Sequence, residues 1–238
     1  RMTEFLERNA RLYPNDVCLV EINPEIKEDR RVTWKEYELI EPSPKTSYRR
    51  EITWSVFNEK ANRFANLLLQ RGIKKGDKVA ILMMNGLAVP LNFRYSSDEI
   101  EYCVNLAEAD VLVFSNPFIG RVEEIADRIS KGRLLIYVGE GCPGFADDYN
   151  SLSANCSSQS PAIPLFEDDD AAIYFSSGTT GFPKAILHKH KSLTHSCLVE
   201  QNHHGQTKDD VFLCIPPLYH TGAKMHWFGS LISGSKAV

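Results

Sequence analysis

Three short apolar runs constrain the fold of this chain most strongly. They lie at residues 79–84, 111–114 and 134–138, and each is flanked by charged or turn-forming residues. Near-continuous apolar runs of this length are typical of strands that are buried on both faces, as in parallel sheets covered by helices. Segments with helical spacing alternate with these runs, so the sequence predicts an α/β fold of layered sheets with helices on both faces.

The predicted helices begin and end at recognisable capping residues. Thr53 precedes a run with apolar residues at helical spacing, and Gly72 follows it at the position where a left-handed residue ends many helices. Ser96 and Glu99 have the spacing of a capping box, which predicts a helix to about residue 108. Further helices are predicted over residues 1–12 and 119–130 and from Ser192 onward.

Residues 139–170 form the longest stretch without a clear helix or strand pattern. The stretch contains three prolines and ends in four consecutive acidic residues, 167–170. Such segments commonly connect folded units. We therefore predict a linker over residues 151–170, between a first α/β subdomain over 1–150 and the start of a second over 171–238. The strands predicted in the second are 171–176, 185–188 and 211–215.

The composition argues against several classes of partner. The chain has 238 residues and a formal net charge of −4, so no overall basic field predicts nucleic-acid binding. No apolar run approaches the roughly 20 residues that span a bilayer, and the first residues do not resemble a secretory signal. The six cysteines include no CxxC pair, which favours free thiols in a reducing compartment. We expect a cytoplasmic protein without an integral membrane segment.

The segment 174–184 carries the most chemistry in the sequence. It reads Tyr-Phe-Ser-Ser-Gly-Thr-Thr-Gly-Phe-Pro-Lys and lies between two predicted strands. Its serine, threonine and glycine residues expose N–H and O–H donors that can surround phosphate oxygens, and Lys184 adds a cation. The spacing differs from GxxxxGK[ST], in which the lysine opens a helix, and no GxGxxG is present. The residues alone leave two interpretations open, a phosphate-binding loop and an ordinary turn.

The nine residues 176–184 resemble the signature loop of the adenylate-forming, AMP-binding superfamily, which includes acyl-CoA synthetases, luciferases and the adenylation domains of peptide synthetases. Further segments resemble motifs of the same family, in the same order and at nearly the same spacing: 72–80, 88–92 and 216–222. A match of this length is far more specific than a short motif. The resemblance implies the N-terminal domain of the adenylate-forming fold, incomplete in a chain of this length.

The resemblance also implies an activity, namely the ATP-dependent activation of a carboxylic acid to an acyl-adenylate, followed by transfer to CoA. The implied substrates and cofactors are ATP, Mg²⁺, CoA and a small carboxylic acid. Donors aimed at the leaving pyrophosphate stabilise the charge that develops there. The implied phosphate-binding residues are Ser176, Ser177, Gly178, Thr179, Thr180, Gly181 and Lys184. The implied catalytic residues are His220, Lys184 and Thr179.

Residues 216–222 resemble the family's aromatic and histidine motif at the acyl pocket. The implied substrate-binding residues are Tyr219, His220, Thr221 and Gly222. The resemblance implies that His220 lies beside the α-phosphate and the acyl carboxylate. Without the resemblance, the simpler interpretation is that Tyr219 and His220 cap the end of a strand. His226 and Trp227 are further candidates for the acyl pocket. No metal site made by protein side chains is predicted, because the other histidines lack the spacing of zinc ligands.

Two features depart from the family pattern. The family carries a crossover helix between the strands that correspond to 79–84 and 88–91, but this chain has only residues 85–87 at that position. A connection between parallel strands usually needs about a dozen residues or more. Either the helix is absent or residues are missing from the sequence, and we favour the second interpretation. The chain also ends at Val238, before the family's later adenine-binding segment, hinge and C-terminal lid, so we expect these 238 residues alone to be inactive.

Two other functions stay open beside an AMP-forming acid–CoA ligase of fatty acid metabolism. A stand-alone adenylation domain hands its acyl group to a carrier protein, and a catalytically silent domain only binds a nucleotide. The presence of Lys184 argues against a silent domain. The chain lacks the long N-terminal extension expected of acetyl-specific relatives, which favours a medium, long or aromatic acid. A homodimer is left open.

Overall fold

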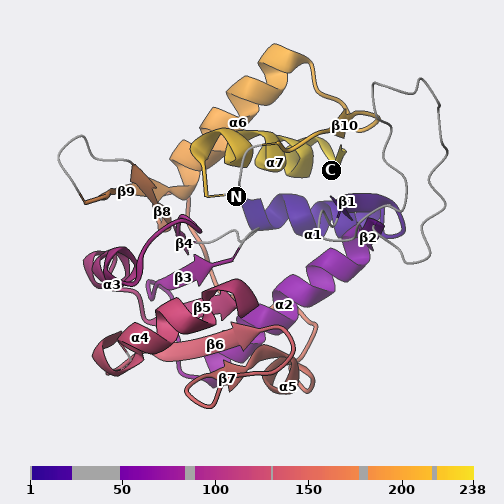
Figure 1. The fold of residues 1–238 in the computed structure, drawn as a ribbon. Helices are drawn as coiled ribbons and strands as arrows, with labels where there is room; N and C mark the ends of the chain where they lie inside the picture. Colours follow the sequence, from indigo (N-terminus) through magenta and orange to yellow (C-terminus); the bar gives the residue numbers. More distant parts are fainter. Residues whose placement is uncertain (1, 23–48, 84–88, 130, 177–181, 216–218) are drawn as a thin grey trace, which may run out of the picture.

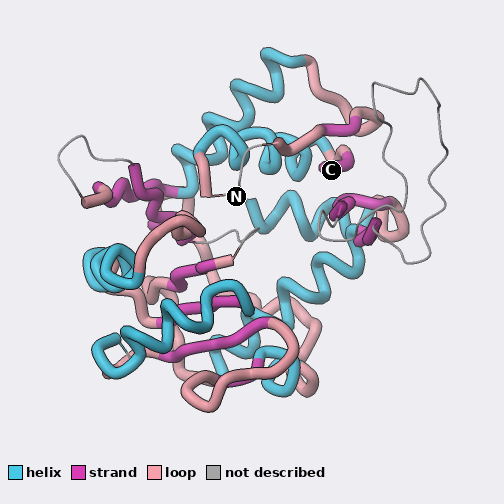
Figure 2. Tube along the Cα trace, viewed as in Figure 1, coloured by secondary structure: helices cyan, strands magenta, loops and turns pink. Residues whose placement is uncertain are grey.

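The computed structural model describes residues 2–22, 49–83, 89–129, 131–176, 182–215 and 219–238 (Figure 1). Its helices are α1 (Met2–Leu12), α2 (Trp54–Gln70), α3 (Ser97–Leu106), the short 3-10 helix η1 (Asn116–Phe118), α4 (Ile119–Ile129), α5 (Tyr149–Ser153), α6 (His190–His204) and α7 (Thr221–Ser233). Its strands are β1 (Val17–Ile22), β2 (Arg49–Thr53), β3 (Val79–Leu82), β4 (Val89–Pro90), β5 (Val111–Ser115), β6 (Leu134–Val138), β7 (Asp147–Asp148), β8 (Asp170–Ser176), β9 (Lys184–Lys189), β10 (Val211–Phe212) and β11 (Lys236–Ala237). Helical and strand segments alternate along the chain (Figure 2).

A parallel sheet with the strand order β4-β3-β5-β6-β7 forms the centre of the first half of the chain. The three apolar runs of the sequence are its strands β3, β5 and β6. The register places Ala80 beside Leu112 and Leu112 beside Leu135. One face packs under α3 and α4, and the other packs under α2 and α5. The predicted α/β fold, with helices on both faces of a parallel sheet, is confirmed.

Alternate side chains of each strand enter different cores. In β5, Leu112 and Phe114 join the core beneath α3 and α4, whereas Val111 and Val113 join the core beneath α2. These four side chains are between 0% and 4% exposed. Burial of a side chain of this size stabilises the fold by about 1.5–3 kcal/mol, so β5 is held from both faces.

The helix boundaries follow the capping residues of the sequence. The Thr53 side chain accepts a hydrogen bond from the Val56 N–H at the start of α2. Gly72 lies just beyond the C-cap of α2 with a φ of 82°, as expected of a residue that ends a helix in the left-handed region. Ser96 and Glu99 form both hydrogen bonds of a capping box. Helix α3 ends at Leu106, two residues before the predicted end, and α6 begins two residues before the predicted start.

Strand β4 pairs with β3 although only six residues, 83–88, join the two strands. The register sets Val89 beside Ala80. Because β4 is only two residues long, the chain has to return only from Leu82 to the level of Ala80. Six extended residues span up to roughly 20 Å, which is enough. The position of the predicted missing helix falls within residues 84–88, outside the described residues, so our preference for missing residues stays a prediction.

A second sheet joins the two ends of the chain. Its order is β10-β11-β1-β2, with β1 antiparallel to β2 and parallel to β11. Strand β2 pairs with β1. The C-terminal end accordingly lies beside β1 in Figure 1. Strands from the predicted subdomains 1–150 and 171–238 meet in this sheet, and the subdomain boundaries themselves stay a prediction.

The stretch 139–170 contains more regular structure than its composition indicated. It includes β7 and the short helix α5. Asp148 caps α5, because its carboxylate accepts hydrogen bonds from the backbone N–H and the hydroxyl of Ser151. Tyr149 and Leu152 then pack into the core beneath α2. One aspartate cap and two apolar side chains therefore fix a helix that is too short to show a periodic pattern.

Helix α1 is attached to the end of α7 through buried polar groups. The Asn9 side chain is 0% exposed, and its Nδ2 donates to the Leu231 carbonyl at 2.7 Å. Arg8 Nη2 donates to Asn9 Oδ1 at 2.8 Å and to the Ile232 carbonyl at 2.5 Å. The last carbonyls of a helix lack partners within the helix, so α1 supplies the missing donors across more than 220 residues of sequence.

The described residues give one finding on the thiols and one on the helices. All six cysteines are free. Burial raises the pKa of the Cys18 and Cys103 thiols to about 12, so both stay protonated at neutral pH. No helix in the described part of the chain has the length and apolar character needed to cross a membrane.

We expect Asn9→Ala to lower the free energy of unfolding by about 1–3 kcal/mol, because it leaves the buried Leu231 carbonyl without its donor. Urea unfolding followed by circular dichroism measures the loss. Asn155→Ala is the matched control, since Asn155 is exposed. Equal stability of the two variants would show that the contact between α1 and α7 does not stabilise the fold.

Candidate functional site

The predicted phosphate-binding loop connects the two strands of the β8–β9 hairpin. Ser176 ends β8 and pairs with Lys184, the first residue of β9, so the two ends of the loop are held together by the strand ladder. Lys184 is exposed at this position, whereas Ser176 is half-buried. The residues between them that we expected to contact phosphate lie outside the described residues, namely Ser177, Gly178, Thr179, Thr180 and Gly181. Their roles stay predictions.

The exit of the loop rests on helix α3. The rings of Phe182 and Tyr102 lie with their centroids 4.6 Å apart and their planes 31° apart. Pro183, which follows, is buried although Phe182 is 54% exposed. Sequence patterns do not point to Tyr102, because one aromatic residue on a polar helix face has no distinctive spacing. The contact fixes where the chain leaves the loop and enters β9 at Lys184.

His220 forms the N-cap of helix α7. Its Nδ1 accepts a hydrogen bond from the backbone N–H of Gly222 at 3.2 Å. A nitrogen that accepts carries no proton, so the neutral ring bears its proton on Nε2 and can donate it to an acceptor. A Cβ added to Gly222 would lie 3.3 Å from Nδ1, so glycine lets the imidazole approach the backbone. The N-terminus of a helix also favours anions.

Tyr219 contacts an aromatic residue that the sequence analysis missed. Its ring lies edge-on to that of Phe93, with the centroids 5.8 Å apart. Phe93 follows β4, and the Arg94 guanidinium lies over its ring at 5.4 Å. The motif that we recognised ended at Asn92, one residue too early. The chain continues as Phe-Arg-Tyr, a cation between two aromatic residues. This pattern could have pointed to Phe93 as a residue near the site.

Three segments therefore converge at one side of the molecule. Strand β4 packs beside β8, and Phe93 connects the end of β4 to the start of α7 through Tyr219. In Figure 1 the start of α7 lies on the same side as β4 and β8. Ligands of α/β proteins bind at the carboxyl ends of the strands, and Phe93 marks such an end. The start of α7 supplies a helix N-terminus and the His220 ring at this side of the molecule.

Comparison with known proteins identifies the family. A family model described as AMP-binding enzyme matches residues 42–238. The chain belongs to the AMP-binding enzyme family. It is 30% identical over 191 residues to a crotonobetaine/carnitine–CoA ligase of Proteus mirabilis, covering 72% of this chain and 37% of that protein. It is 25% identical over 195 residues to 4-hydroxybutyrate–CoA ligase 2 of Metallosphaera sedula, covering 72% of this chain and 35% of that protein.

Solved structures of AMP-binding enzymes share the fold. The anthranilate CoA ligase AuaEII in complex with anthranoyl-AMP superposes with a TM-score of 0.83 at 21% identity, covering all of this chain and 44% of that one. ATP-bound MatB from Rhodopseudomonas palustris gives 0.74 at 22% identity, covering 99% and 44%. The chain thus spans between a third and a half of the length of these relatives. The predicted N-terminal part of the adenylate-forming fold is confirmed.

Trp227 and His188 of this member of the AMP-binding enzyme family pack against aromatic neighbours. Trp227 is 3% exposed, and its ring lies 5.8 Å from that of Phe57 on α2, so it belongs to the core between the helices. The His188 ring contacts Tyr174 edge-on. The side chains of Thr221 and His226 are outside the described part. Within that part, no three His, Cys, Asp or Glu side chains are grouped closely enough to hold a metal ion.

We expect His220→Ala to lower the free energy of unfolding by about 0.5–1 kcal/mol, because the first turn of α7 loses its capping acceptor. His220→Asn should keep most of the stability, since an asparagine oxygen can accept the same N–H. Denaturant titration of both variants measures the difference. Equal losses for alanine and asparagine would contradict the assigned cap.

The Tyr102–Phe182 contact can be measured with a double-mutant cycle. We expect Tyr102→Ala and Phe182→Ala to be coupled by about 0.5–1.5 kcal/mol, the range for aromatic pairs. Leu106→Ala combined with Phe182→Ala is the control cycle, because Leu106 lies on the same helix and is also exposed. Additive effects in both cycles would mean that α3 does not hold the end of the loop.

Proposed function

We propose that this chain contributes the ATP and carboxylate sites of an AMP-forming acid–thiol ligase. The proposal rests chiefly on one observation: a nine-residue phosphate-loop motif whose ends, Ser176 and Lys184, are paired in a hairpin that packs beside β4. The names of the relatives support it, because both curated proteins described above are CoA ligases. Since the chain spans under half of their length, the complete activity belongs to the proposal.

In the proposed reaction, a carboxylate oxygen attacks the α-phosphorus of ATP. A new oxygen–phosphorus bond forms as the bond to the leaving pyrophosphate breaks, and the electron pair of that bond passes to pyrophosphate. Lys184 and the loop N–H groups stabilise this charge as it develops. His220 donates its Nε2 proton as a hydrogen bond to the carboxylate or to an α-phosphate oxygen, which holds the two reactants in line. Transfer of the acyl group to a thiol then releases AMP.

The described side chains do not supply a cation cage for Mg²⁺. No group of three or more His, Cys, Asp or Glu residues lies close together in that part of the chain. A magnesium ion bound together with ATP would neutralise charge on the phosphate oxygens, which are ligands that this cation accepts readily. We derive no step of the reaction from it.

The acid substrate is proposed to be larger than acetate. The relatives named above act, by their names, on 4-hydroxybutyrate, crotonobetaine or carnitine, and a further one is named a long-chain-fatty-acid–CoA ligase of Mycobacterium tuberculosis. CoA is the proposed acceptor, because these names share it. A carrier-protein acceptor is the second candidate, with an identical first half-reaction. The six free cysteines support a reducing compartment such as the cytoplasm.

Carboxylate-dependent exchange of labelled pyrophosphate into ATP tests the proposal. The assay compares short, medium, long and aromatic acids, on the 238-residue chain and on the longest natural protein that contains it. We expect exchange with one class of acid in the longer protein and little or none with the shorter chain. A folded longer protein that exchanges with no acid in the presence of Mg²⁺ would favour a silent nucleotide-binding domain.

We expect Lys184→Ala to lower the exchange rate of the active protein by about 10²–10³-fold, the usual effect of removing one group that stabilises transition-state charge. Lys131→Ala, at an exposed lysine after α4, is the control and should exchange normally. Unchanged exchange in Lys184→Ala would remove this residue from the phosphate site.

A further inference from the structure

The turn at residues 92–95, between β4 and α3, is held by a cation from another helix. Arg121 of α4 donates from Nη1 to the Phe93 carbonyl at 2.8 Å and to the Tyr95 carbonyl at 2.7 Å. The Tyr95 N–H donates in turn to the Asn92 carbonyl at 3.0 Å, which closes the turn. Hydrogen bonds from charged donors are stronger than those between neutral groups, so Arg121 fixes the course of the backbone between the two elements.

Arg121 makes no ion pair within the part of the chain that the structure describes. Its guanidinium lies over the Phe118 ring, 4.8 Å from the ring centroid, and its side chain is half-buried. Partial burial of a cation costs free energy unless its donors find acceptors. The acceptors here are the two main-chain carbonyls of the turn. The arginine therefore acts on the shape of the turn and does not balance a carboxylate.

The turn places Phe93 against the residue that precedes His220. The rings of Phe93 and Tyr219 lie edge-on with their centroids 5.8 Å apart. Tyr95 lies close to the same residue: burial raises the pKa of the Tyr95 hydroxyl, and the neighbouring Tyr219 contributes to the rise. The next residue in the chain, His220, is the N-cap of α7. A shift of the turn would therefore move Tyr219 and, with it, the His220 ring.

Helix α3, which begins directly after the turn, contacts the other part of the candidate site. Its Tyr102 ring packs on Phe182, at the exit of the phosphate loop, with the centroids 4.6 Å apart. Helices α3 and α4 lie side by side (Figure 1). The Ser97 hydroxyl of α3 donates to the Glu124 carboxylate of α4 at 2.5 Å. The segment from the turn to the end of α3 thus contacts both Tyr219 and Phe182, and α4 holds it in place.

We propose that Arg121 is a positioning residue for His220. It holds the carbonyls of Phe93 and Tyr95, and thereby fixes the Phe93 ring, Tyr219 and the His220 ring. The expected effect on the rate rests on the proposed function, in which His220 aligns the carboxylate with the α-phosphorus. A misplacement of about 1 Å in such an arrangement lowers the rate by about 10²-fold. Arg121 itself contacts neither reactant in this proposal and acts only through the turn.

The position of the His220 ring can be measured without any activity. The 238-residue chain is labelled with carbon-13 histidine, and the Cε1–H resonance of His220 is assigned by its absence from His220→Asn. We expect Arg121→Met, which removes the donors, to shift this resonance, because the ring moves relative to its aromatic neighbours. Arg133→Met is the matched control. Arg133 also donates to two carbonyls, those of Ala109 at 2.6 Å and Ile129 at 3.1 Å, but not to those of the turn.

Exchange of labelled pyrophosphate into ATP, on the longest natural protein that contains the chain, measures the consequence for the reaction. At saturating acid and ATP, we expect Arg121→Met to lower the exchange rate by about 10–100-fold, while the acid concentration that gives half the maximal rate changes by less than about 3-fold. Arg121→Lys should recover most of the rate, because both hydrogen bonds come from one nitrogen, which a lysine ammonium can replace. Arg133→Met should exchange as the parent protein does.

A double variant tests whether Arg121 acts through Phe93. Phe93→Leu removes the ring that contacts Tyr219 and should lower the exchange rate to a similar extent. The combination of Arg121→Met with Phe93→Leu should lose no more than the larger of the two single losses, because both changes break one connection. Multiplication of the two losses would overturn the inference, since the arginine would then act by another route.

Two further outcomes would overturn the inference: a His220 resonance that Arg121→Met leaves unmoved, and an exchange rate that this variant leaves at the parent value. Equal effects of Arg121→Met and Arg133→Met would do the same, because they would reduce the role of Arg121 to general stability. A parent protein that exchanges with no acid would overturn the proposed function instead. A His220 resonance that moves in Arg121→Met but not in Arg133→Met would, even then, support the positioning of the ring.

Discussion

The hydrogen bond from the buried Asn9 side chain to the Leu231 carbonyl determines how the second half of the chain is placed. Helix α7 is attached at its C-terminal end to α1 by Asn9 and Arg8. Strand β11, which follows α7, pairs with β1. These contacts hold the C-terminal end of α7. They therefore also set the position of its N-terminal end, where the N-cap His220 lies near the end of β4. The proposed chemistry at His220 therefore depends on contacts made by the first twelve residues.

A second connection fixes the hairpin that carries the phosphate loop. Lys75, in the turn before β3, pairs with Asp169, the residue before β8. Asp169 also accepts a hydrogen bond from the Phe166 N–H and provides its carbonyl to His190 N–H at the start of α6. The side-chain carboxylate and the backbone carbonyl of Asp169 thus connect the parallel sheet, the start of β8 and helix α6, which follows β9. Because the ion pair is partly exposed, it contributes little to the free energy of unfolding. Its main effect is to position the segments that it joins.

Local features of the sequence predicted the elements well, because they act over a few residues. The capping box at Ser96, the glycine after α2 and the apolar strands each depend on near neighbours along the chain. Contacts between distant residues could not be predicted in the same way. The pairing of β1 with β11 and the contact of Tyr102 with Phe182 have no pattern in one sequence, since each partner is an ordinary residue of its own element.

The same limit applies to the candidate site. The resemblance implied roles for His220 and Lys184, which stay predictions, but it did not point to Phe93, whose ring contacts Tyr219. The nature of the His220 hydrogen bond also required coordinates. Only the 3.2 Å contact between Nδ1 and the Gly222 N–H indicates which nitrogen carries the proton. Sequence motifs thus indicate which groups are candidates for the chemistry, whereas only the structure shows how their side chains pack.

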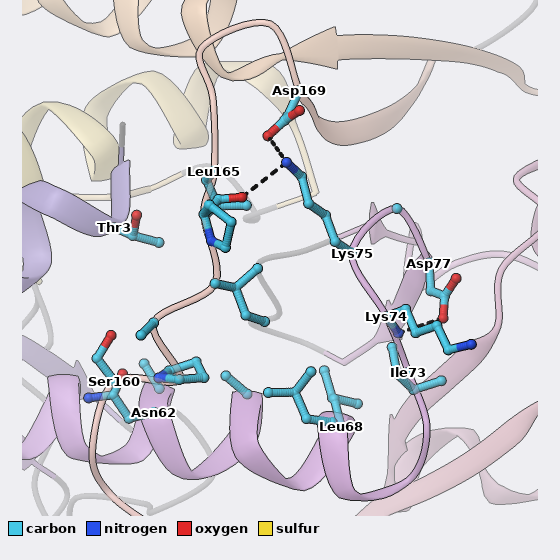
Figure 3. Close-up of a pocket in the computed structure, with 18 of the residues that line it drawn as sticks. Thr3, Asn62, Leu68, Ile73, Lys74, Lys75, Asp77, Ser160, Leu165 and Asp169 are labelled. Atoms are coloured by element: carbon cyan, nitrogen blue, oxygen red, sulfur yellow. Dashed lines mark hydrogen bonds and ion pairs between the residues drawn. The ribbon is translucent and has the colours of Figure 1, made fainter.

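Asp169 also lies at the point where the first half of the chain meets the strand that leads into the phosphate loop. It immediately precedes β8 and pairs with Lys75 in the turn before β3 (Figure 3). Strand β8 ends at Ser176, whose pairing with Lys184 joins the two ends of the loop. Strand β4 packs beside β8 as well. The first half of the chain therefore contacts the hairpin at two places, and the position of the proposed phosphate loop depends on both.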